Sequence, residues 1–178
     1  MKALILIDIQ KGFDDPKWGA RNNPSAEAVA ARLLEHWRSL RWPVFHVRHD
    51  STETDSPLRP ETSGNEFKEI TRPLAGEVIV GKCVNSAFIG TTLNAQMKCA
   101  HVDEVFIAGL TTPHCVSTTA RMAGNLGYRT YVVSDATAAF EWRAHNGTML
   151  SADDMHFYAL AALHGEFATI ISSDDLLR

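Results

Sequence analysis

The chain has 178 residues, of which 45% are hydrophobic and 21% are charged, and its formal net charge is −4. These values predict a single globular domain spanning residues 1–178, and the small negative charge favours neither nucleic acid nor an anionic membrane as a partner. The three cysteines are widely spaced and do not suggest a disulfide framework, and no apolar stretch approaches the roughly 18 residues that cross a bilayer. We therefore expect a reducing, cytoplasmic location.

Apolar runs alternate with helical patterns in the first half of the chain. We expect strands over residues 3–7, 43–47 and 77–80, and an amphipathic helix over residues 24–40 between the first two strands. Residues 51–66, rich in Ser, Thr, Pro and alternating charge, predict a long irregular surface segment. Loops of that length inside a compact domain tend to be functional.

The same alternation continues in the second half of the chain. We expect helices and strands, in chain order, over residues 91–99 (helix), 105–108 (strand), 113–123 (helix), 129–133 (strand), 152–163 (helix) and 167–171 (strand). Alternating strands and helices predict a six-stranded, mostly parallel sheet with helices on both faces, a three-layer α/β/α fold of the Rossmann-like type. In such sheets the reactive side chains gather beyond the carboxyl ends of the strands.

Cys115 lies in the most informative of these strand-to-helix turns. The apolar run of residues 105–108 ends at Gly109, and Thr112 with Pro113 predicts the N-cap and first position of the next helix. Unpaired N–H groups and partial positive charge at a helix N-terminus are expected to push the Cys115 thiol towards thiolate. The same N–H groups could receive the oxyanion that forms when a thiolate attacks a carbonyl.

Two further residues follow strands at the same edge of the predicted sheet. Asp8 comes directly after the first strand, where poor solvation would raise the pKa of its carboxyl and suit it to exchange a proton with a thiol. Lys82 follows the third strand and would hold the thiolate and the carboxylate in their charged forms. Cys83 and Cys99 lack such a setting, and we assign them to packing.

Several stretches together resemble a known family. They are residues 6–13 (LIDIQKGF), Lys82 with residues 85–88 (NSAF), residues 109–116 (GLTTPHCV) and residues 164–168 (HGEFA). In combination they resemble the isochorismatase-like superfamily of cysteine hydrolases, which includes nicotinamidases and N-carbamoylsarcosine amidases. The resemblance covers nearly the whole chain.

The resemblance implies roles for particular residues. Asp8, Lys82 and Cys115 would form the catalytic triad, and the peptide bond between Leu110 and Thr111 would be cis. The backbone N–H groups of Thr111 and Cys115 would form the oxyanion hole. The resemblance also implies a homodimer or a homotetramer.

The substrate pocket is expected beside these residues. Phe13, Trp18 and Trp142 lie in loops after strand ends, where aromatic walls for a planar or apolar substrate belong. An equally good interpretation is that these aromatic side chains pin their loops to the core. We also place Gln10 and Asn85 in the pocket, although Asn85 could instead cap the next helix.

We expect no cofactor and no bound metal. Nicotinamidases resemble one another in an Asp-x-His pair plus a further His that bind metal. His46 and His49 here are an odd number of residues apart, so they would face opposite sides if the strand runs through both. Asp154 and His156 have the Asp-x-His spacing but lie on the late helix, where a solvated face is the simpler interpretation.

These observations predict a cysteine hydrolase that cleaves the C–N bond of a small amide or ureido compound through a thioester on Cys115. Two alternatives remain open: an isochorismatase-type vinyl ether hydrolase and a non-catalytic α/β ligand-binding relative. A nucleotide-binding module is disfavoured because no G-x-G-x-x-G follows the first strand. A dyad of Cys115 with His114 is not expected, because adjacent helical residues diverge by about 100°.

Overall fold

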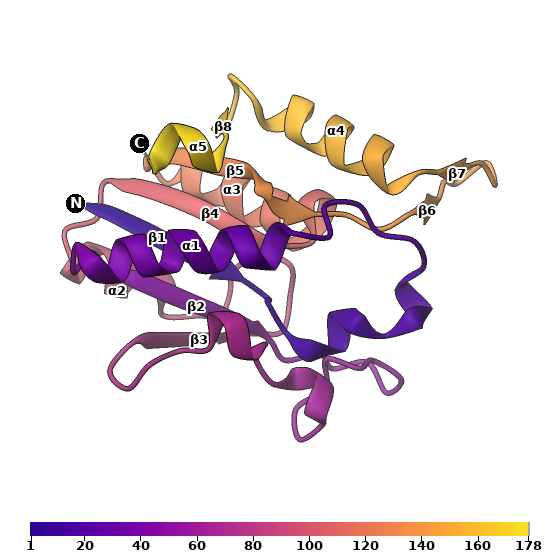
Figure 1. The fold of residues 1–178 in the computed structure, drawn as a ribbon, viewed down its shortest axis with the longest axis horizontal. Helices are drawn as coiled ribbons and strands as arrows, with labels where there is room; N and C mark the ends of the chain where they lie inside the picture. The colour runs from indigo at the N-terminus through magenta and orange to yellow at the C-terminus, as the bar shows by residue number, and fades with distance from the viewer. Residues whose placement is uncertain (178) are drawn as a thin grey trace.

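The computed structural model describes residues 1–177 and is built around a six-stranded parallel sheet (Figure 1). The strands lie in the order β3-β2-β1-β4-β5-β8, and every neighbouring pair is parallel. Their bounds are β1 (Lys2–Ile7), β2 (Val44–His49), β3 (Val78–Lys82), β4 (Glu104–Leu110), β5 (Arg129–Ala138) and β8 (Thr169–Ile171). The predicted strand number, direction and fold class are therefore confirmed.

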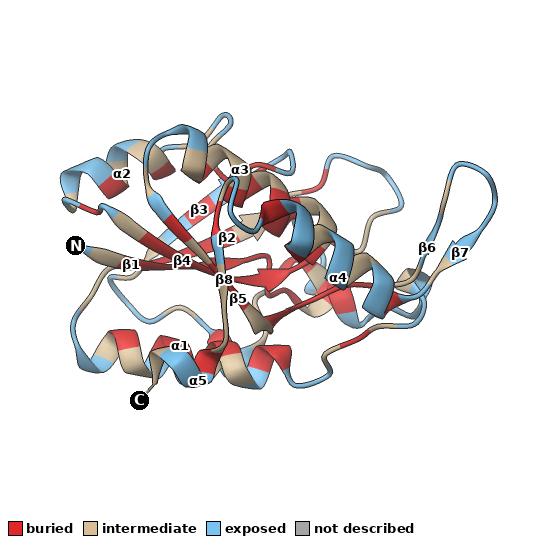
Figure 2. Cartoon of the chain, turned by 90° about the horizontal axis from the view of Figure 1, so that it is seen from above, coloured by how far each residue is buried: buried red, intermediate tan, exposed pale blue. Residues whose placement is uncertain are grey.

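Helices cover both faces of the sheet (Figure 2). One face carries α1 (Ala26–Ser39) and α5 (Ser173–Leu176), and the other carries α2 (Leu93–Cys99) and α3 (Ser117–Asn125). Helix α4 (Ala152–Leu163) packs into the core on the α2–α3 side through Leu160 and Leu163. Alternate residues of β1 point to the two faces: Leu4 and Leu6 join the core under α1, and Ile5 joins the core under α3. Burial on both faces explains why β1 is a continuous apolar run.

The second half of the sheet differs from the sequence prediction in detail. β5 continues five residues past the predicted end at Val133, because its register against β4 shifts after Ile107 and pairing resumes between Gly109 and Thr137. This stretch contains polar residues, and for that reason the sequence pattern indicated that the strand ends before them. A hairpin of β6 (Trp142–Arg143) and β7 (Met149–Leu150) was not predicted, because two-residue strands carry no detectable period.

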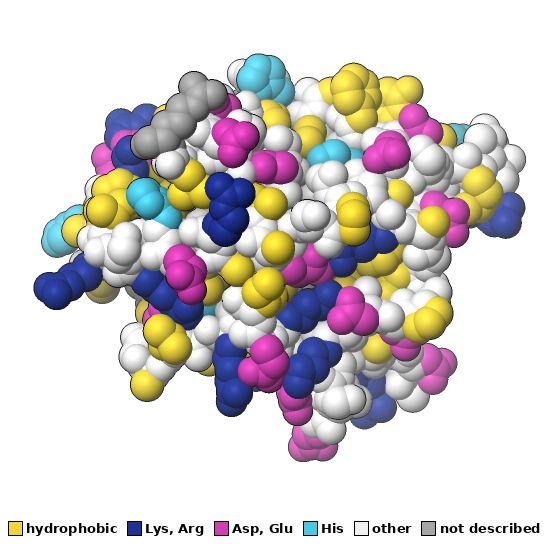
Figure 3. All heavy atoms as spheres, viewed as in Figure 1, with side chains coloured by type: hydrophobic (Ala, Val, Ile, Leu, Met, Phe, Trp, Pro, Cys, Tyr) yellow, Lys and Arg dark blue, Asp and Glu magenta, His cyan; other side chains and the backbone are white. Residues whose placement is uncertain are grey.

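Short helical turns shape the loops beyond the carboxyl ends of the strands. They are the 3₁₀ turns Lys11–Asp14, Pro16–Trp18, Ser63–Asn65 and Glu69–Thr71, and a π-helical turn, Thr112–Val116. On the face shown in Figure 3, acidic and basic side chains are interspersed rather than gathered by sign. Within residues 1–177, none of the helices combines the length and the apolar character that a membrane crossing requires.

Candidate active site

Asp8, Lys82 and Cys115 meet at the carboxyl edge of the sheet. Asp8 directly follows β1, Lys82 is the last residue of β3, and Cys115 lies in the turn after β4. The Lys82 Nζ lies 2.7 Å from Asp8 Oδ2 and 3.2 Å from Cys115 Sγ. All three are buried, with 0%, 1% and 7% of their surfaces exposed respectively. Three residues that are far apart in the chain therefore meet at the edge of the sheet where the sequence predicts them, at the carboxyl ends of the strands.

A close approach between β1 and β4 places these groups. Gly109 lies opposite Ile7 in the register and has φ +121°, and a Cβ at this position would lie 2.0 Å from the Ile7 carbonyl oxygen. Only glycine fits such a site without displacing the backbone. Asp8, the residue directly after β1, has φ +51°. The Leu110–Thr111 peptide bond that follows Gly109 is cis, at the position that the family resemblance indicates.

The turn that carries Cys115 begins one residue earlier than predicted. Thr111, with extended backbone angles, is the N-cap of the π-helical turn Thr112–Val116, which runs directly into α3. Thr112 is already part of the turn, and its hydroxyl lies 2.8 Å from Nδ1 of His156 on α4. The prediction that His156 lies on a solvated face is therefore wrong, because this half-buried imidazole packs against the turn.

Burial dominates the electrostatics of the site. It raises the pKa of Asp8 above its ordinary value, although Lys82 opposes the change, as predicted for a carboxyl at a strand end. Burial disfavours the charge of Lys82, but attraction to Asp8 and Cys115 outweighs it and raises the pKa of that ammonium. Burial and Asp8 together raise the pKa of the Cys115 thiol to about 12. The expectation of a resting thiolate is wrong, because desolvation outweighs the favourable charge of Lys82.

His49 is a fourth member of the cluster that sequence reasoning did not place there. It ends β2 as the register partner of Lys82, and its Nδ1 lies 2.8 Å from the Lys82 Nζ. Burial, assisted by the charge of Lys82, lowers the pKa of His49 to about 4, so the neutral imidazole accepts a hydrogen bond from the ammonium. Its position at a strand end, like that of Asp8, was the signal that could have identified it.

Gln10 supports His49 rather than lining a pocket. Its side chain is fully buried, with Oε1 accepting from the His49 N–H at 2.8 Å and Nε2 donating to the Asn65 carbonyl at 2.9 Å. The predicted pocket role for Gln10 is therefore wrong, because both ends of its amide are used by backbone groups. Gln10 joins the end of β2 to the long segment before β3.

The ligand atoms of Asp8, His49 and Cys115 all lie within 4.8 Å of one another, a spacing that fits a metal ion. Each of these three residues also contacts the Lys82 Nζ, through Asp8 Oδ2 at 2.7 Å, His49 Nδ1 at 2.8 Å and Cys115 Sγ at 3.2 Å. The ammonium thus uses the same ligands that a cation would need, and its charge opposes a second cation. His46 faces away from this cluster, with its Nε2 2.8 Å from Glu77, as the alternation along β2 predicts.

A cavity of about 300 Å³ opens beside the cluster. It is lined by Asp8, Phe13, Trp18, His49, Ser51, Glu53, Ser56, Leu58, Asn85, Thr111, His114, Cys115, Phe140 and Trp142. Four of the five side chains predicted for the pocket are among them, the exception being Gln10. Residues 51–58 supply four further lining residues, and the length of this irregular segment was the signal for them. No sequence signal indicated Phe140.

The aromatic lining residues also pack against one another. The ring of Phe13 lies 5.2 Å from that of Trp18 and 6.2 Å from that of Phe140, measured between centroids. Phe13 and Phe140 belong to a core cluster with Leu110, and the Trp18 Nε1 donates to the Gly12 carbonyl at 2.8 Å. For Phe13 and Trp18 both interpretations therefore hold, because these side chains fix their loops and line the cavity. Trp142 lines the cavity but is 49% exposed and belongs to no core cluster of the described residues.

Asn85 and His114 lie next to the thiol in different ways. The Cys115 thiol is 3.9 Å from Asn85 Oδ1, a long contact in which sulfur donates. His114 directs its Nδ1 to the Thr111 hydroxyl at 3.0 Å, and its ring lies 5.0 Å from that of Trp142. These contacts hold the imidazole of His114 away from a dyad with Cys115, as the angle between adjacent helical residues indicates.

The other two cysteines are exposed, so their assignment to packing is wrong. Cys83 follows the buried Lys82, and neighbouring residues of an extended chain point to opposite sides. Cys99 is the last residue of α2, where the helix meets solvent.

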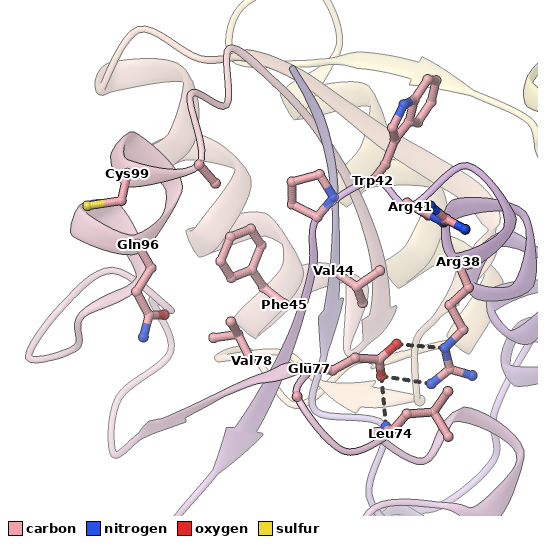
Figure 4. A pocket seen from close by; sticks show the side chains of 13 residues that line it. Arg38, Arg41, Trp42, Val44, Phe45, Leu74, Glu77, Val78, Gln96 and Cys99 are labelled. Atoms are coloured by element: carbon pink, nitrogen blue, oxygen red, sulfur yellow. Dashed lines mark hydrogen bonds and ion pairs between the residues drawn. The ribbon is translucent and has the colours of Figure 1, made fainter.

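A larger hollow of about 740 Å³ lies at the other end of the strands (Figure 4). It is bordered by the end of α1 and by the first residues of β2 and β3. Its main polar contact is the ion pair in which Arg38 Nε and Nη2 lie 2.7 and 2.8 Å from the two oxygens of Glu77. Because that carboxylate is already neutralised and Cys115 is at the opposite edge, we place the candidate active site in the smaller cavity.

Comparison with known proteins agrees with this architecture. The family profile described as the isochorismatase domain matches residues 2–175. The isochorismatase family protein YrdC of Bacillus subtilis is 51% identical over 177 residues, which cover 99% of this chain and 95% of that protein. Nicotinamidase 3 of Arabidopsis thaliana is 30% identical over 84% of this chain and 79% of its own length. A solved isochorismatase-family structure from Chromobacterium violaceum superposes with a TM-score of 0.96 at 42% identity, covering 99% of this chain and 91% of that one.

Proposed function

The chain belongs to the isochorismatase family of hydrolases, and on that basis we propose that it is a cysteine hydrolase that cleaves the C–N bond of a small amide or ureido compound. The observation that carries this proposal is the position of the Lys82 ammonium, in contact with both Asp8 and Cys115. The relative named a nicotinamidase supports an amide as the target bond.

In the first step Cys115 attacks the carbonyl carbon of the substrate. The raised pKa of the Asp8 carboxyl makes its carboxylate a stronger base, so it accepts the thiol proton as the S–C bond forms. Lys82 stabilises negative charge on the sulfur during this transfer. The resulting oxyanion is received by the backbone N–H groups of Thr111 and Cys115, the pair that the family resemblance implies.

In the second step the C–N bond breaks. The protonated Asp8 donates its proton to the departing nitrogen, ammonia or an amine leaves, and a thioester remains on Cys115. Asp8 then takes a proton from a water molecule that attacks the thioester carbonyl. When the S–C bond breaks, the sulfur recovers that proton from Asp8, and the acid is released with the thiol restored.

A screen for ammonia release from small amides and ureido compounds tests this function. We expect at least one compound to be hydrolysed, and the Cys115→Ala variant to lose at least about a thousandfold in kcat while keeping the circular dichroism of the parent protein. The Cys83→Ser variant is the matched control, because it alters an exposed thiol beside the site and should keep full activity. Undiminished hydrolysis by the Cys115→Ala variant would refute the mechanism.

The family name favours one alternative, hydrolysis of a vinyl ether by an isochorismatase-type reaction. That reaction does not depend on a thioester, so it would survive replacement of Cys115 by Ala. The same variant therefore separates the two activities when isochorismate is included among the compounds.

A homodimer or homotetramer and a cytoplasmic location remain predictions. The side chains of Phe157 and Tyr158 on α4 are 66% and 62% exposed, an apolar pair that a second subunit could cover. Light scattering coupled to size-exclusion chromatography measures the molar mass, for which we expect two or four times the 19.6 kDa of one chain.

A further inference from the structure

The cavity has a one-sided charge distribution. Asp8 and Glu53 are the acidic residues that line it, and its lining includes neither lysine nor arginine. The ammonium of Lys82 lies behind the lining with no exposed surface, and Asp8 neutralises it. Glu53 is exposed, and no ion pair to its carboxylate is found within residues 1–177. A ligand entering the cavity therefore meets an uncompensated negative charge.

Local contacts hold Glu53 at the cavity. Its backbone N–H donates to the hydroxyl of Ser51 at 3.3 Å, and Ser51 is itself buried and lines the cavity. Lys17, over the ring of Trp18, donates to the Asp55 carbonyl at 2.9 Å, and Arg59 donates to the Thr54 carbonyl at 3.2 Å. Neither cation lines the cavity, and neither pairs with the Glu53 carboxylate in the part of the chain that the structure describes.

The aromatic walls favour the same class of ligand. Four aromatic side chains, Phe13, Trp18, Phe140 and Trp142, line the cavity, and aromatic side chains bind planar rings and cations. A volume of about 300 Å³ is at the small end of the range for ligand sites, so one ring with a short substituent fills it.

We propose that the preferred substrate is a small aromatic amide with a cationic group at the end remote from the scissile bond, and that Glu53 selects for that charge. This inference rests on the proposed amide hydrolysis, for which it specifies the substrate class. In this proposal the carbonyl is bound at Cys115, the ring packs against the aromatic side chains, and the cation pairs with Glu53. A substrate with a carboxylate at the remote end meets repulsion from Glu53 and finds no lysine or arginine in the lining.

Binding of three matched amides tests the charge preference without turnover. The probes are benzamide, 4-(aminomethyl)benzamide and 4-carboxybenzamide, which differ chiefly in the charge of one substituent at pH 7. They are titrated calorimetrically into the Cys115→Ala protein, both alone and combined with Glu53→Gln or with Glu61→Gln. Glu61 is a matched control because it is an exposed glutamate of the same segment that does not line the cavity.

We expect 4-(aminomethyl)benzamide to bind about tenfold more tightly than benzamide, and 4-carboxybenzamide to bind about tenfold more weakly. Glu53→Gln should bring the three dissociation constants to within about threefold, and Glu61→Gln should leave the order unchanged. Equal affinities in the parent protein, tightest binding of the carboxylate, an order that survives Glu53→Gln, or no binding of any probe would overturn the inference.

The same compounds, added to protein with Cys115 intact, report ammonia release separately. Binding in the predicted order without ammonia release would refute the proposed hydrolysis of these amides and support the charge selectivity. Ammonia release with no dependence on substituent charge would support hydrolysis and overturn the selectivity.

Discussion

Replacing Lys82 with Met removes the one charge that contacts Asp8, His49 and Cys115 at once. Methionine keeps an unbranched apolar side chain, so the main change is loss of the ammonium that lies 2.7 Å from Asp8 Oδ2. Removing one partner of a buried ion pair typically costs about 3–5 kcal/mol, because the other charge stays buried without compensation. We expect the free energy of unfolding at pH 7 to fall by that amount, and amide hydrolysis to fall at least about a thousandfold.

The pH dependence of this loss has a defined sign. Without the ammonium, burial raises the pKa of Asp8 further above its unfolded value, so the folded variant binds a proton more tightly than the unfolded chain does. The stability that Lys82→Met loses relative to the parent protein should therefore shrink as the pH is lowered from 8 towards about 4, the unfolded pKa of an aspartate. The two proteins are compared at each pH because His49, whose pKa is lowered to about 4, costs the parent protein stability below about pH 6.5, where the unfolded chain binds a proton that the folded chain does not.

A double-mutant cycle separates the ion pair from packing. Asp8→Asn alone leaves the ammonium unpaired and should also destabilise the fold, whereas Asp8→Asn combined with Lys82→Met removes both charges and should be more stable than either single variant. Urea unfolding followed by tryptophan fluorescence gives the four free energies. Lys98→Met, at an exposed position of α2, is the control and should change stability by no more than about 0.5 kcal/mol. Additive losses in the double variant would show that the two charges are not coupled and would refute this reasoning.

Two further predictions concern the thiols and the contact between β1 and β4. At pH 7 without substrate, iodoacetamide should modify the exposed Cys83 and Cys99 before Cys115. The rate of Cys115 alkylation should keep rising above pH 9, because the pKa of its thiol is raised to about 12. Peptide mass spectrometry that finds Cys115 modified first would contradict this prediction. Gly109→Ala should cost about 3 kcal/mol or more in thermal unfolding, since it combines the contact with a backbone oxygen of β1 and an unfavourable positive φ. Gly76→Ala shares only the positive φ and should cost less; equal losses for the two would argue against the close approach.

Much of the site could be predicted because parallel strands align their carboxyl ends. Asp8, Lys82 and Cys115 each follow or end an apolar run, so their common edge could be derived without knowing any contact. The same rule applies to His49, which ends the second strand of the sheet order β3-β2-β1 and lies at the same edge. His49 is the last residue of β2 and the register partner of Lys82, so its position at the strand end, and not its spacing from His46, places it at the site.

Other features depended on contacts that residue type does not specify. Gln10 follows the first strand like a pocket residue, yet its amide is used by backbone groups on two other segments. The thiol of Cys115 has the helix-end position that favours a thiolate, but its degree of burial, which reverses the direction of the pKa change, comes from tertiary packing. The hairpin that carries Trp142 has strands of two residues, too short to be indicated by a sequence period, although Trp142 itself lines the cavity.

Trapping of the acyl-enzyme tests the central role of the sulfur most directly. Protein mixed with an amide that it hydrolyses is quenched in acid within milliseconds and analysed as the intact chain and as peptides by mass spectrometry. We predict that the mass of the acyl group is added to the chain and that the modified residue is Cys115. Hydroxylamine should remove this adduct, and the Cys115→Ala variant should not form it. Steady ammonia release with no acyl adduct on Cys115 at any quench time, and with activity retained in that variant, would contradict the mechanism.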